Sequence, residues 1–381
     1  MFSDLVNYLT VILLISYLIY FNKLNIKIGL ILACLSSFPI FLIGTIIPID
    51  LVSDVIQYTL YTQHHRAELG LGASVNAEDF NTLSRHKGLT VDKIGFIYAL
   101  VPIPFIDNFK SIGFSNKFLL ILLISYIYSH KDRRDYFIIF FLLFFPSIIF
   151  YSSTGLKDTL VLVTMVPLAF FIVEKNLLAT ILFLFILYIF RTVNVILLVP
   201  IISVYFIVFS KLNINIKLFI ILFTSIIALI FLYIKADSIL DSLNNYRLAR
   251  AYEDVFAANP SIAAGTNIYI AGDFYQLTIS ILTESIRFFV LPSLFNADSL
   301  FEKIQSIENI FIIVLLSYLF YKLYLFNKMK CLFWILSLLF IAGIYGYVQT
   351  NVGTLVRYKF VFIAMFVTII VHEIKFGKLK E

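Results

Sequence analysis

The sequence predicts an all-α, polytopic integral membrane protein with about eleven (ten to twelve) transmembrane helices and two large outer-face loops. Of the 381 residues, 61% are hydrophobic and only 14% are charged, whereas soluble domains average about 25% charged residues. The mean hydropathy is +0.97. The apolar residues also fall into runs that are long enough to cross about 30 Å of hydrocarbon. These observations together indicate one polytopic membrane domain over residues 1–381.

The predicted spans share an apolar stretch of near-spanning length that is bounded by polar or basic residues. In chain order they are 5–21, 28–48, 112–130, 136–151, 158–173, 177–190, 194–209, 218–234, 307–326, 331–349 and 356–373.

Two further apolar stretches are expected to lie at the membrane surface or to re-enter it. The first, 94–106, is short and contains Pro102 and Pro104, which would break a spanning helix. The second, 275–291, is long enough to span but contains an acid and an arginine. We therefore count neither stretch as a span.

The basic residues of the short loops predict the orientation. Lysine-rich loops fall on one side when the N-terminus lies outside, and the loops 49–111 and 235–306 then lie on the outer face. Most of the arginines belong to that outer face: Arg66, Arg85, Arg191, Arg247, Arg250, Arg287 and Arg357. Arginine's planar fork suits phosphate, so phosphate binding is one interpretation. The other is that these arginines pair with acids of the same face.

The stretch FPSIIFYSSTGLKDTL (145–160) places a small polar turn between two apolar runs. Hydrocarbon cannot satisfy free backbone groups, so such a turn lies at a membrane face or lines a cavity. The hydroxyl of Ser153, the flexible Gly155 and the cation of Lys157 could cup an oxyanion at the mouth of a helix pair. The alternative is an ordinary turn in which Lys157 and Asp158 neutralise each other.

Arg191 interrupts the apolar run 177–209. A cation in such a run is costly unless it faces a polar cavity or an anion; the alternative is a snorkelling residue at a helix end. Asn194 is expected on the same helical face and could share a ligand. No acid lies within 187–195. The balancing charge is therefore an acidic side chain on another span or a bound anion, and we favour the bound anion.

The segment NVGTLVRYK (351–359) could form a second anion site. If a helix begins near Thr354, its N-terminal amides and Arg357 would face one ligand, with Asn351 beside them. The alternative is a basic anchor at the membrane surface.

Two acids, Glu284 and Asp54, are candidate bases. Glu284 and Arg287 are three residues apart on one helix face, so they form either an ion pair or a base beside a phosphate clamp. Asp54 and Tyr58 also share a helix face, where the carboxylate could accept the proton of a sugar hydroxyl. The alternative for Asp54 is a solvated acid on an interfacial helix.

Several function classes lack their sequence signals. Two cysteines give no disulfide framework, and the pair His64–His65 lacks a third ligand at metal-site spacing. Walker, GxSxG, HExxH and CxxC patterns are absent. The net charge of +6 is spread over short loops, which indicates membrane orientation rather than a nucleic-acid partner.

Four features, in this order, resemble the Wzy-type O-antigen and capsular polysaccharide repeat-unit polymerases of bacterial inner membranes. They are PSIIFYSSTGLKDTL (146–160), the arginine inside a mid-chain apolar run (Arg191), RFFVLPSLFNADSLFEKIQSIENIF (287–311) and NVGTLVRYKFVF (351–362). The paired arginine-to-glycine loop motifs of some members have no clear copy around Arg247 and Arg250.

The resemblance implies a multi-span helical fold that joins undecaprenyl-pyrophosphate-linked oligosaccharides at the periplasmic face of the inner membrane. The pyrophosphate ligands would be Arg191, Arg357 and Lys157, with Arg287 as a weaker fourth. The base would be Asp54 or Glu284. Supporting residues would be Ser153, Asp158, Tyr58, Asn194 and Asn351. No metal or cofactor is expected, and the partners would be membrane lipid, a chain-length regulator and a flippase.

Two other classes stay open. An O-antigen ligase or a polyprenyl-phosphate-sugar-dependent glycosyltransferase would share the loops and cations but use another acceptor or donor. A non-enzymatic transporter of lipid-linked oligosaccharides would carry internal repeats and broken helices. The two halves of this sequence show no repeat, which argues against a transporter.

Overall fold

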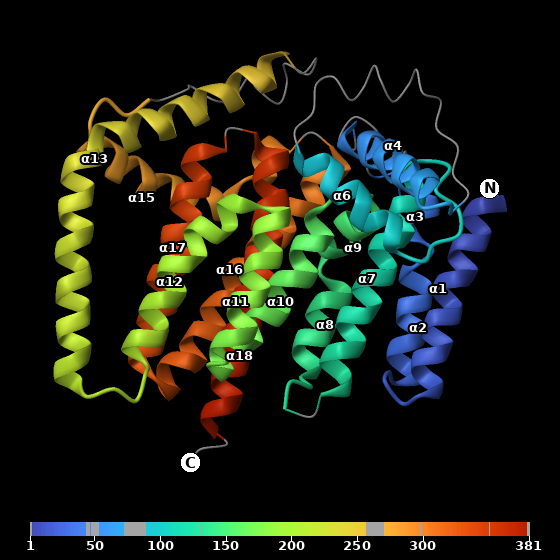
Figure 1. The fold of residues 1–381 in the computed structure, drawn as a ribbon, viewed down its shortest axis with the longest axis horizontal. Coiled ribbons are helices and arrows are strands. Elements are labelled where there is room, and N and C mark those ends of the chain that lie inside the picture. Colours follow the sequence, from blue (N-terminus) through green and yellow to red (C-terminus); the bar gives the residue numbers. More distant parts are fainter. Residues whose placement is uncertain are drawn as a thin grey trace. The chain divides into compact units, whose positions relative to one another are not determined.

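The computed structural model describes residues 2–42, 46, 53–71, 89–130, 132–256, 270–297, 299–349 and 351–378. Within these ranges the regular structure is helical and contains no strand (Figure 1), so the predicted all-α fold is confirmed. The chain divides into two compact units. Unit 1 comprises Met1–Phe170 with Ile181–Thr192, and unit 2 comprises Phe171–Thr180 with Val193–Glu381.

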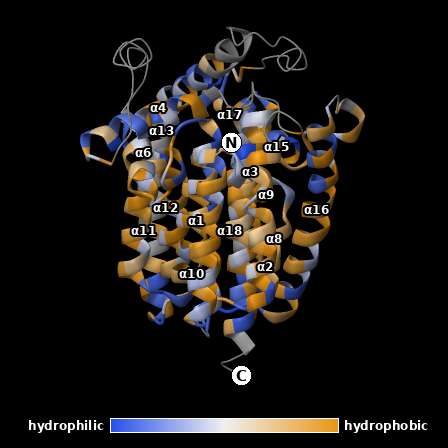
Figure 2. Ribbon diagram, turned by 90° about the vertical axis from the view of Figure 1, so that its right-hand side faces the viewer, coloured by the Kyte–Doolittle hydropathy of each residue, from blue (hydrophilic) through white to orange (hydrophobic). Residues whose placement is uncertain are grey.

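The helices support the prediction of a helical membrane protein. Those that are long and apolar enough to cross a membrane are Phe2–Tyr20 (α1), Phe109–Ser129 (α7), Leu300–Phe326 (α16), Lys328–Val348 (α17) and the stretch Val352–Phe376 of α18 (Val352–Lys378). Shorter apolar helices are Ile26–Phe41 (α2 with α3), Leu177–Phe190 (α11) and Thr192–Val208 (α12). Apolar residues predominate along the middle of these helices and polar residues gather at their ends (Figure 2). The eleven-span topology stays a prediction.

Two helices of unit 1, α2 and α7, begin after an asparagine N-cap. α2 (Ile26–Leu35) follows Asn25, whose side chain accepts a hydrogen bond from the backbone N–H of Lys27 at 2.8 Å. α7 follows Asn108, which accepts from the N–H of Lys110 at 2.8 Å and of Ser111 at 3.2 Å. Asparagine is among the best N-cap residues because it satisfies these otherwise unpaired donors. α7 packs against α1 and against the helix over Pro146–Ser153 (α9).

The helices Ser53–Glu68 (α4) and Leu89–Leu100 (α6) pack against each other in unit 1 (Figure 1). α6 ends two residues before Pro102, as the two prolines of 94–106 require. Side chains from α1 and α4 donate hydrogen bonds to carbonyls of the non-helical segment that follows α6. Arg66, on α4, donates to the carbonyls of Val101 at 2.9 Å and Pro104 at 3.2 Å. Asn7, on α1, donates to that of Phe105 at 2.8 Å, and Gln63, on α4, donates to that of Ile106 at 2.5 Å. The segment 94–106 therefore contains no continuous helix.

The expected span 136–151 is two helices in the structure. Tyr136–Phe144 (α8) and Pro146–Ser153 (α9) are bent by 59° relative to each other. The break follows from Pro146, which has no N–H to donate to the preceding turn and whose ring clashes with it. Proline is instead well suited to the first position of a new helix.

The next helix, Asp158–Glu174 (α10), matches the predicted span 158–173. In unit 2, by contrast, Ile214–Phe256 (α13) is a single helix of 43 residues that continues far beyond the predicted end at 234. The extension contains neither Gly nor Pro and is rich in Leu and Ala, all of which favours helix. α13 changes direction along its length (Figure 1). Part of the expected outer loop 235–306 is thus helical.

Phe274–Val290 (α15) packs closely on α17 in unit 2. Two glycines of α17 permit the approach. A Cβ atom on Gly343 would lie 2.5 Å from the carbonyl oxygen of Ile281, and one on Gly346 would lie 2.2 Å from that of Glu284. Both distances are well inside van der Waals contact, so only glycine fits without moving α15. The described residues after α15 include a short 3-10 helix, Leu294–Asn296 (η2), before α16.

Candidate functional site

Arg191 lies at the break between α11 and α12 and forms a buried ion pair. Its Nη2 donates to Oδ1 of Asp158 at 2.7 Å, and the two side chains are 7% and 0% exposed. Asp158 is the first residue of α10. The low exposure excludes a snorkelling arginine. Of the two counterions that the sequence left open, the structure supplies an acidic side chain on another helix.

The prediction that Arg191 and Asn194 lie on one face of the same helix was wrong. α11 ends at Phe190 and α12 begins at Thr192, so Arg191 belongs to neither helix. Its N–H still donates to the carbonyl of Leu187 at 2.7 Å, the last bond of α11. Asn194, in unit 2, accepts a hydrogen bond from the hydroxyl of Tyr345.

The polar turn between α9 and α10 is buried and tightly held. Nδ2 of Asn116, on α7, donates to the carbonyls of Thr154 at 2.6 Å and Leu156 at 3.0 Å. The hydroxyl of Tyr98, on α6, lies 2.7 Å from Oδ1 of Asn116 and 3.1 Å from the Leu156 carbonyl. These bonds satisfy backbone carbonyls that are buried away from water, where an unmade bond is costly.

Lys117, the next residue of α7, binds the end of α9. Its Nζ donates to Oγ of Ser152 at 2.8 Å and to the carbonyl of Ile149 at 3.3 Å, and the residue is 2% exposed. The hydroxyl of Ser153 donates to the same Ile149 carbonyl at 2.6 Å. A cation and hydroxyls at the carboxyl end of a helix offset its partial negative charge.

The turn is therefore a packed element, which disfavours the oxyanion cup that was one of the two interpretations of the sequence. A Cβ on Gly155 would lie 2.5 Å from Cγ1 of Val55 on α4, and one on Gly113 of α7 would lie 2.3 Å from the carbonyl of Ser153. Hydroxyls that the sequence assigned to a ligand donate to backbone carbonyls of α9 instead. Lys157, which follows the turn, is half-buried.

Tyr58, Tyr98 and Asp158 are close enough to interact electrostatically. Burial raises the pKa of Tyr98 well above its ordinary value, and the interactions with Tyr58 and Asp158 raise this pKa further. Tyr58 is 4% exposed and lies on α4, one turn after the half-buried Asp54. We call this group, Asp54, Tyr58, Tyr98, Lys157, Asp158 and Arg191, the unit 1 site.

The members of the unit 1 site come from separate parts of the sequence. Asp54 and Tyr58 come from α4, Lys157 and Asp158 from the start of α10, and Arg191 from the α11–α12 break. The electrostatics couple Tyr98 to Tyr58 and Asp158, while the 2.7 Å ion pair joins Asp158 to Arg191.

Glu284, on α15 of unit 2, is shared by two arginines. Nη1 of Arg287 lies 3.1 Å from Oε2 of Glu284, and Nη2 of Arg247 lies 3.3 Å from Oε1. Arg247, on α13, also donates to the carbonyl of Tyr347 and stacks over the Tyr347 ring at 4.5 Å. The ion pair that the sequence offered as one alternative is therefore present. Uptake of a proton by Glu284 would weaken both of its pairs, which disfavours it as a base.

The segment 351–359 begins α18 two residues earlier than expected, at Val352. Oδ1 of Asn351 accepts a hydrogen bond from the N–H of Thr354 at 3.1 Å, so Asn351 caps the helix and occupies one of its N-terminal amides. Arg357 is half-buried in unit 2. Lys359 is 1% exposed and donates to Oδ1 of Asn309 and to the carbonyl of Leu291, both at 2.7 Å.

The sequence reasoning missed Tyr98, Asn116 and Lys117. The signal for two of them was present, because Asn116 and Lys117 lie inside the predicted span 112–130, where polar side chains are costly unless they are bound. Tyr98 carried no comparable signal. Within the described ranges, no group of three or more His, Cys, Asp or Glu could hold a metal ion.

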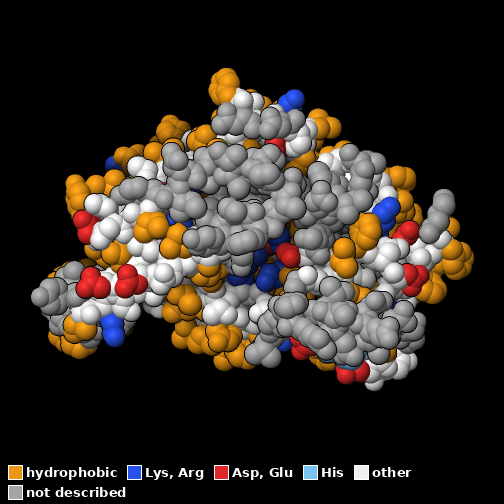
Figure 3. Space-filling model, turned by 90° about the horizontal axis from the view of Figure 1, so that it is seen from above, with side chains coloured by type: hydrophobic (Ala, Val, Ile, Leu, Met, Phe, Trp, Pro, Cys, Tyr) orange, Lys and Arg blue, Asp and Glu red, His pale blue; other side chains and the backbone are white. Residues whose placement is uncertain are grey.

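Figure 3 shows one end of the molecule, on which basic and acidic side chains are visible among apolar ones. Comparison with known proteins found no family model, curated protein or solved structure that matches the chain.

Proposed function

We propose that the protein polymerises undecaprenyl-pyrophosphate-linked oligosaccharide repeat units into O-antigen or capsular polysaccharide at the periplasmic face of the bacterial inner membrane. The observation that carries the proposal is the buried Arg191–Asp158 pair, 2.7 Å apart, beside Tyr58 and Tyr98. Ionisable groups buried in a membrane protein mark functional sites by default, because they are costly. The order of the four family-like stretches supports the same activity.

The proposed reaction asks the protein for positioning and for charge stabilisation. The oxygen of an acceptor sugar hydroxyl attacks the anomeric carbon of the donor sugar. The bond from that carbon to the pyrophosphate oxygen breaks, and the lipid pyrophosphate leaves with the electron pair. The hydroxyl proton passes to a carboxylate. Fixed cations around the leaving group lower the barrier because its negative charge grows in the transition state.

The unit 1 site offers a group for each of these roles. Arg191 and Lys157 would hold the leaving pyrophosphate, and Asp158 would orient the Arg191 guanidinium. Asp54 would take the hydroxyl proton, with Tyr58 one turn away as a hydrogen-bonding neighbour. We prefer Asp54 to Glu284 because two arginines already engage Glu284.

Arg357 and Arg287, in unit 2, are further candidates for phosphate contacts. Arg287 is the weaker of the two because Glu284 already pairs with it at 3.1 Å.

The test is polymerisation by the purified protein in liposomes supplied with a synthetic lipid-pyrophosphate-linked repeat unit. We expect a ladder of polymer on a gel. Arg191→Lys keeps the charge but loses the planar fork, so it should shorten the ladder sharply. Arg134→Lys is the matched control, because Arg134 is bound to the carbonyl of Tyr128 at 2.5 Å, away from the unit 1 site.

Other results would contradict the proposal in distinct ways. Movement of a fluorescent lipid-linked repeat across the bilayer without a new glycosidic bond would indicate a transporter. Transfer of a single repeat to a lipid acceptor, without a ladder, would indicate a ligase.

A further inference from the structure

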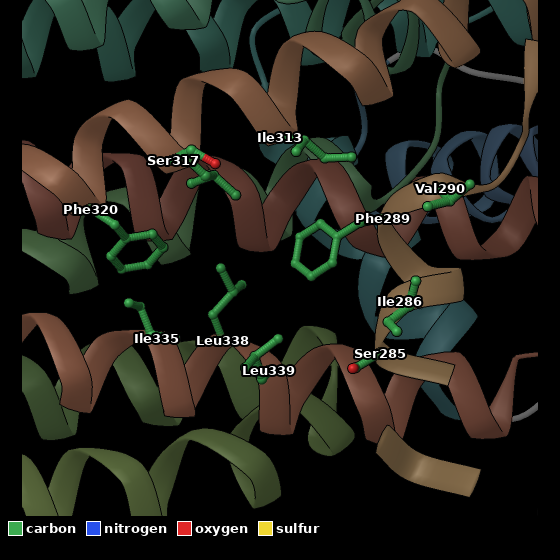
Figure 4. Close-up of a pocket in the computed structure, with 11 residues that line it drawn as sticks. Ser285, Ile286, Phe289, Val290, Ile313, Ser317, Phe320, Ile335, Leu338 and Leu339 are labelled. Carbon is green, nitrogen blue, oxygen red and sulfur yellow. The ribbon is translucent and has the colours of Figure 1, made fainter. Parts of the chain in front are cut away.

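An apolar groove lies between α15, α16 and α17 in unit 2 (Figure 4). Its lining side chains are hydrocarbon except for Ser285 and Ser317, so it contains no cation for a pyrophosphate. The polar contacts around the turn between α9 and α10, in unit 1, are better placed to support the proposed reaction, because the chain leads from that turn directly to Lys157 and Asp158.

Asn116, on α7, binds the polar turn on both sides of Gly155. Its Nδ2 donates to the carbonyl of Thr154 at 2.6 Å and to that of Leu156 at 3.0 Å. The residue is 0% exposed, and these two bonds use both N–H groups of its amide. One side chain therefore fixes the path of the chain into α10.

Tyr98, on α6, fixes which way the Asn116 amide points. Its hydroxyl donates to Oδ1 of Asn116 at 2.7 Å and lies 3.1 Å from the carbonyl of Leu156. A primary amide accepts at its oxygen and donates at its nitrogen, so a donor at the oxygen turns the nitrogen toward the carbonyls of the turn. Tyr98 is itself 0% exposed. The turn is thus held from two helices, α6 and α7.

Packing leaves the turn little room to move. A Cβ on Gly155 would lie 2.5 Å from Cγ1 of Val55 and 2.8 Å from Cβ of Ile112, so the chain at Gly155 is wedged between α4 and α7. Val55 is 0% exposed and directly follows Asp54, the proposed base. The turn therefore also sets the distance between α4 and the start of α10.

The charged groups of the proposed reaction begin where these bonds end. Leu156, whose carbonyl accepts from Asn116, immediately precedes Lys157, and Asp158 is the first residue of α10. A displacement of the Leu156 peptide would move Lys157 and Asp158 with it. It would also move Arg191, whose Nη2 donates to Oδ1 of Asp158 at 2.7 Å. A misplacement of about 1 Å can lower the rate of a reaction by about 100-fold.

We infer that Asn116, with its amide oriented by Tyr98, is a positioning residue for the cations that hold the leaving pyrophosphate. Asn116 does not touch the substrate. It sets the start of α10, which carries Lys157 and aligns Arg191 through Asp158. This inference rests on the proposed function, because that proposal assigns these cations to the pyrophosphate.

The kinetics of polymerisation by the reconstituted protein test the inference. Asn116→Ala should lower kcat by about 10- to 100-fold. Asn7→Ala is the matched control, because Asn7 is also 0% exposed and its amide also binds backbone: it donates to the Phe105 carbonyl at 2.8 Å and accepts from the Phe105 N–H at 3.0 Å. Both variants should lose stability, but Asn7→Ala should keep the kcat of the unaltered protein.

A second pair of variants covers the case in which Asn116→Ala does not fold. Tyr98→Phe removes only the hydroxyl that orients the amide, and it should lower kcat by a smaller factor than Asn116→Ala. Tyr8→Phe is its control, because the hydroxyl that it removes donates to the carbonyl of Ala33 at 3.2 Å. Tyr8→Phe should leave kcat unchanged.

Binding of farnesyl pyrophosphate provides a readout that needs no polymer. It is measured by titration calorimetry with each protein in detergent micelles. The unaltered protein, Asn7→Ala and Tyr8→Phe should bind this probe equally, whereas Asn116→Ala and Tyr98→Phe should bind it more weakly because their cations are displaced.

The outcomes separate this inference from the proposed function. If polymer forms, equal kcat values for Asn116→Ala and Asn7→Ala overturn the inference and leave polymerisation standing. If no polymer forms, weaker binding of farnesyl pyrophosphate by Asn116→Ala alone supports the inference and contradicts polymerisation. Equal binding in that case, or no binding by the unaltered protein, overturns both. Tyr98→Phe and Tyr8→Phe are compared in the same way.

Discussion

Replacement of Arg191 by alanine is expected to destabilise the folded protein. The change removes the guanidinium whose Nη2 lies 2.7 Å from Oδ1 of Asp158, while the Asp158 side chain stays 0% exposed. A carboxylate in such a place keeps its desolvation penalty but loses a counterion. Removal of one partner of a buried ion pair typically costs about 3–5 kcal/mol, and we expect this range for Arg191→Ala.

A neutral double variant shows whether the destabilisation comes from the buried charge that is left without its counterion. Asp158→Asn together with Arg191→Gln leaves no buried charge at either position. Neutral replacement of a whole buried pair is often close to harmless, so the double variant should lie within about 1–2 kcal/mol of the unaltered protein. The coupling between the two positions should then amount to at least about 2 kcal/mol, a size seen for residues in direct contact.

The assay is the free energy of unfolding in mixed micelles for the unaltered protein, Arg191→Ala, the single variants Asp158→Asn and Arg191→Gln, and the double variant that combines these two. Arg134→Ala is the control for loss of an arginine, because Arg134 is only partly buried and stacks over the Tyr128 ring at 4.3 Å. The reasoning is refuted if Arg191→Ala costs less than about 0.5 kcal/mol, or if the double variant is as unstable as the sum of the singles.

Three further changes have expected outcomes. Asn116→Ala removes the donor that binds two buried carbonyls at 2.6 and 3.0 Å, and should lower the free energy of unfolding by about 1–3 kcal/mol; an unchanged value would contradict the described turn. Gly346→Ala places a Cβ 2.2 Å from the Glu284 carbonyl and should lower the melting temperature, whereas Gly272→Ala, whose nearest neighbour is the side chain of Gln276 at 3.3 Å, should not. Because the pKa of Tyr98 is raised above its ordinary value of 10.0, the native protein keeps a proton that the unfolded chain releases. The free energy of unfolding should therefore fall as the pH rises above about 10, and Tyr98→Phe should reduce that fall; an equal fall in both proteins would contradict the burial.

Local signals in the sequence predicted helix positions well. The span 177–190 coincides with α11, and 158–173 differs from α10 by one residue, because a polar or charged residue bounds each apolar run. Pro102 and Pro104 correctly ended the helix of the segment 94–106.

Signals that depend on tertiary packing were harder to interpret. The sequence could not identify Asp158 as the partner of Arg191, because the pairing of positions 33 residues apart depends on how helices pack. For the polar turn after α9 the sequence left two interpretations, an oxyanion cup and an ordinary turn, because its residue types suit both. The bonds that hold it come from Asn116 and Lys117, and the sequence does not show which backbone groups these side chains bind. The length of α13 was underestimated because the hydrophobic run ends long before the helix does.

The same distinction applies to Glu284. Spacing offered an ion pair with Arg287 as one of two alternatives, since residues three apart on a helix are neighbours. The second arginine, Arg247, comes from another helix, 37 residues earlier in the chain. It is this second contact that shifts the proposed base to Asp54.

Polymer formation by Asp54→Asn tests the central claim most directly. The change keeps the size and shape of the side chain and removes its ability to accept the hydroxyl proton, so the account predicts that the polymer ladder disappears while the protein stays folded and abundant in the membrane. Asp92→Asn is the control, because Asp92 is a half-buried acid of unit 1 that pairs with His65 at 2.9 Å, and it should form a full ladder. A full ladder from folded Asp54→Asn protein would contradict the assignment of the chemistry to the unit 1 site.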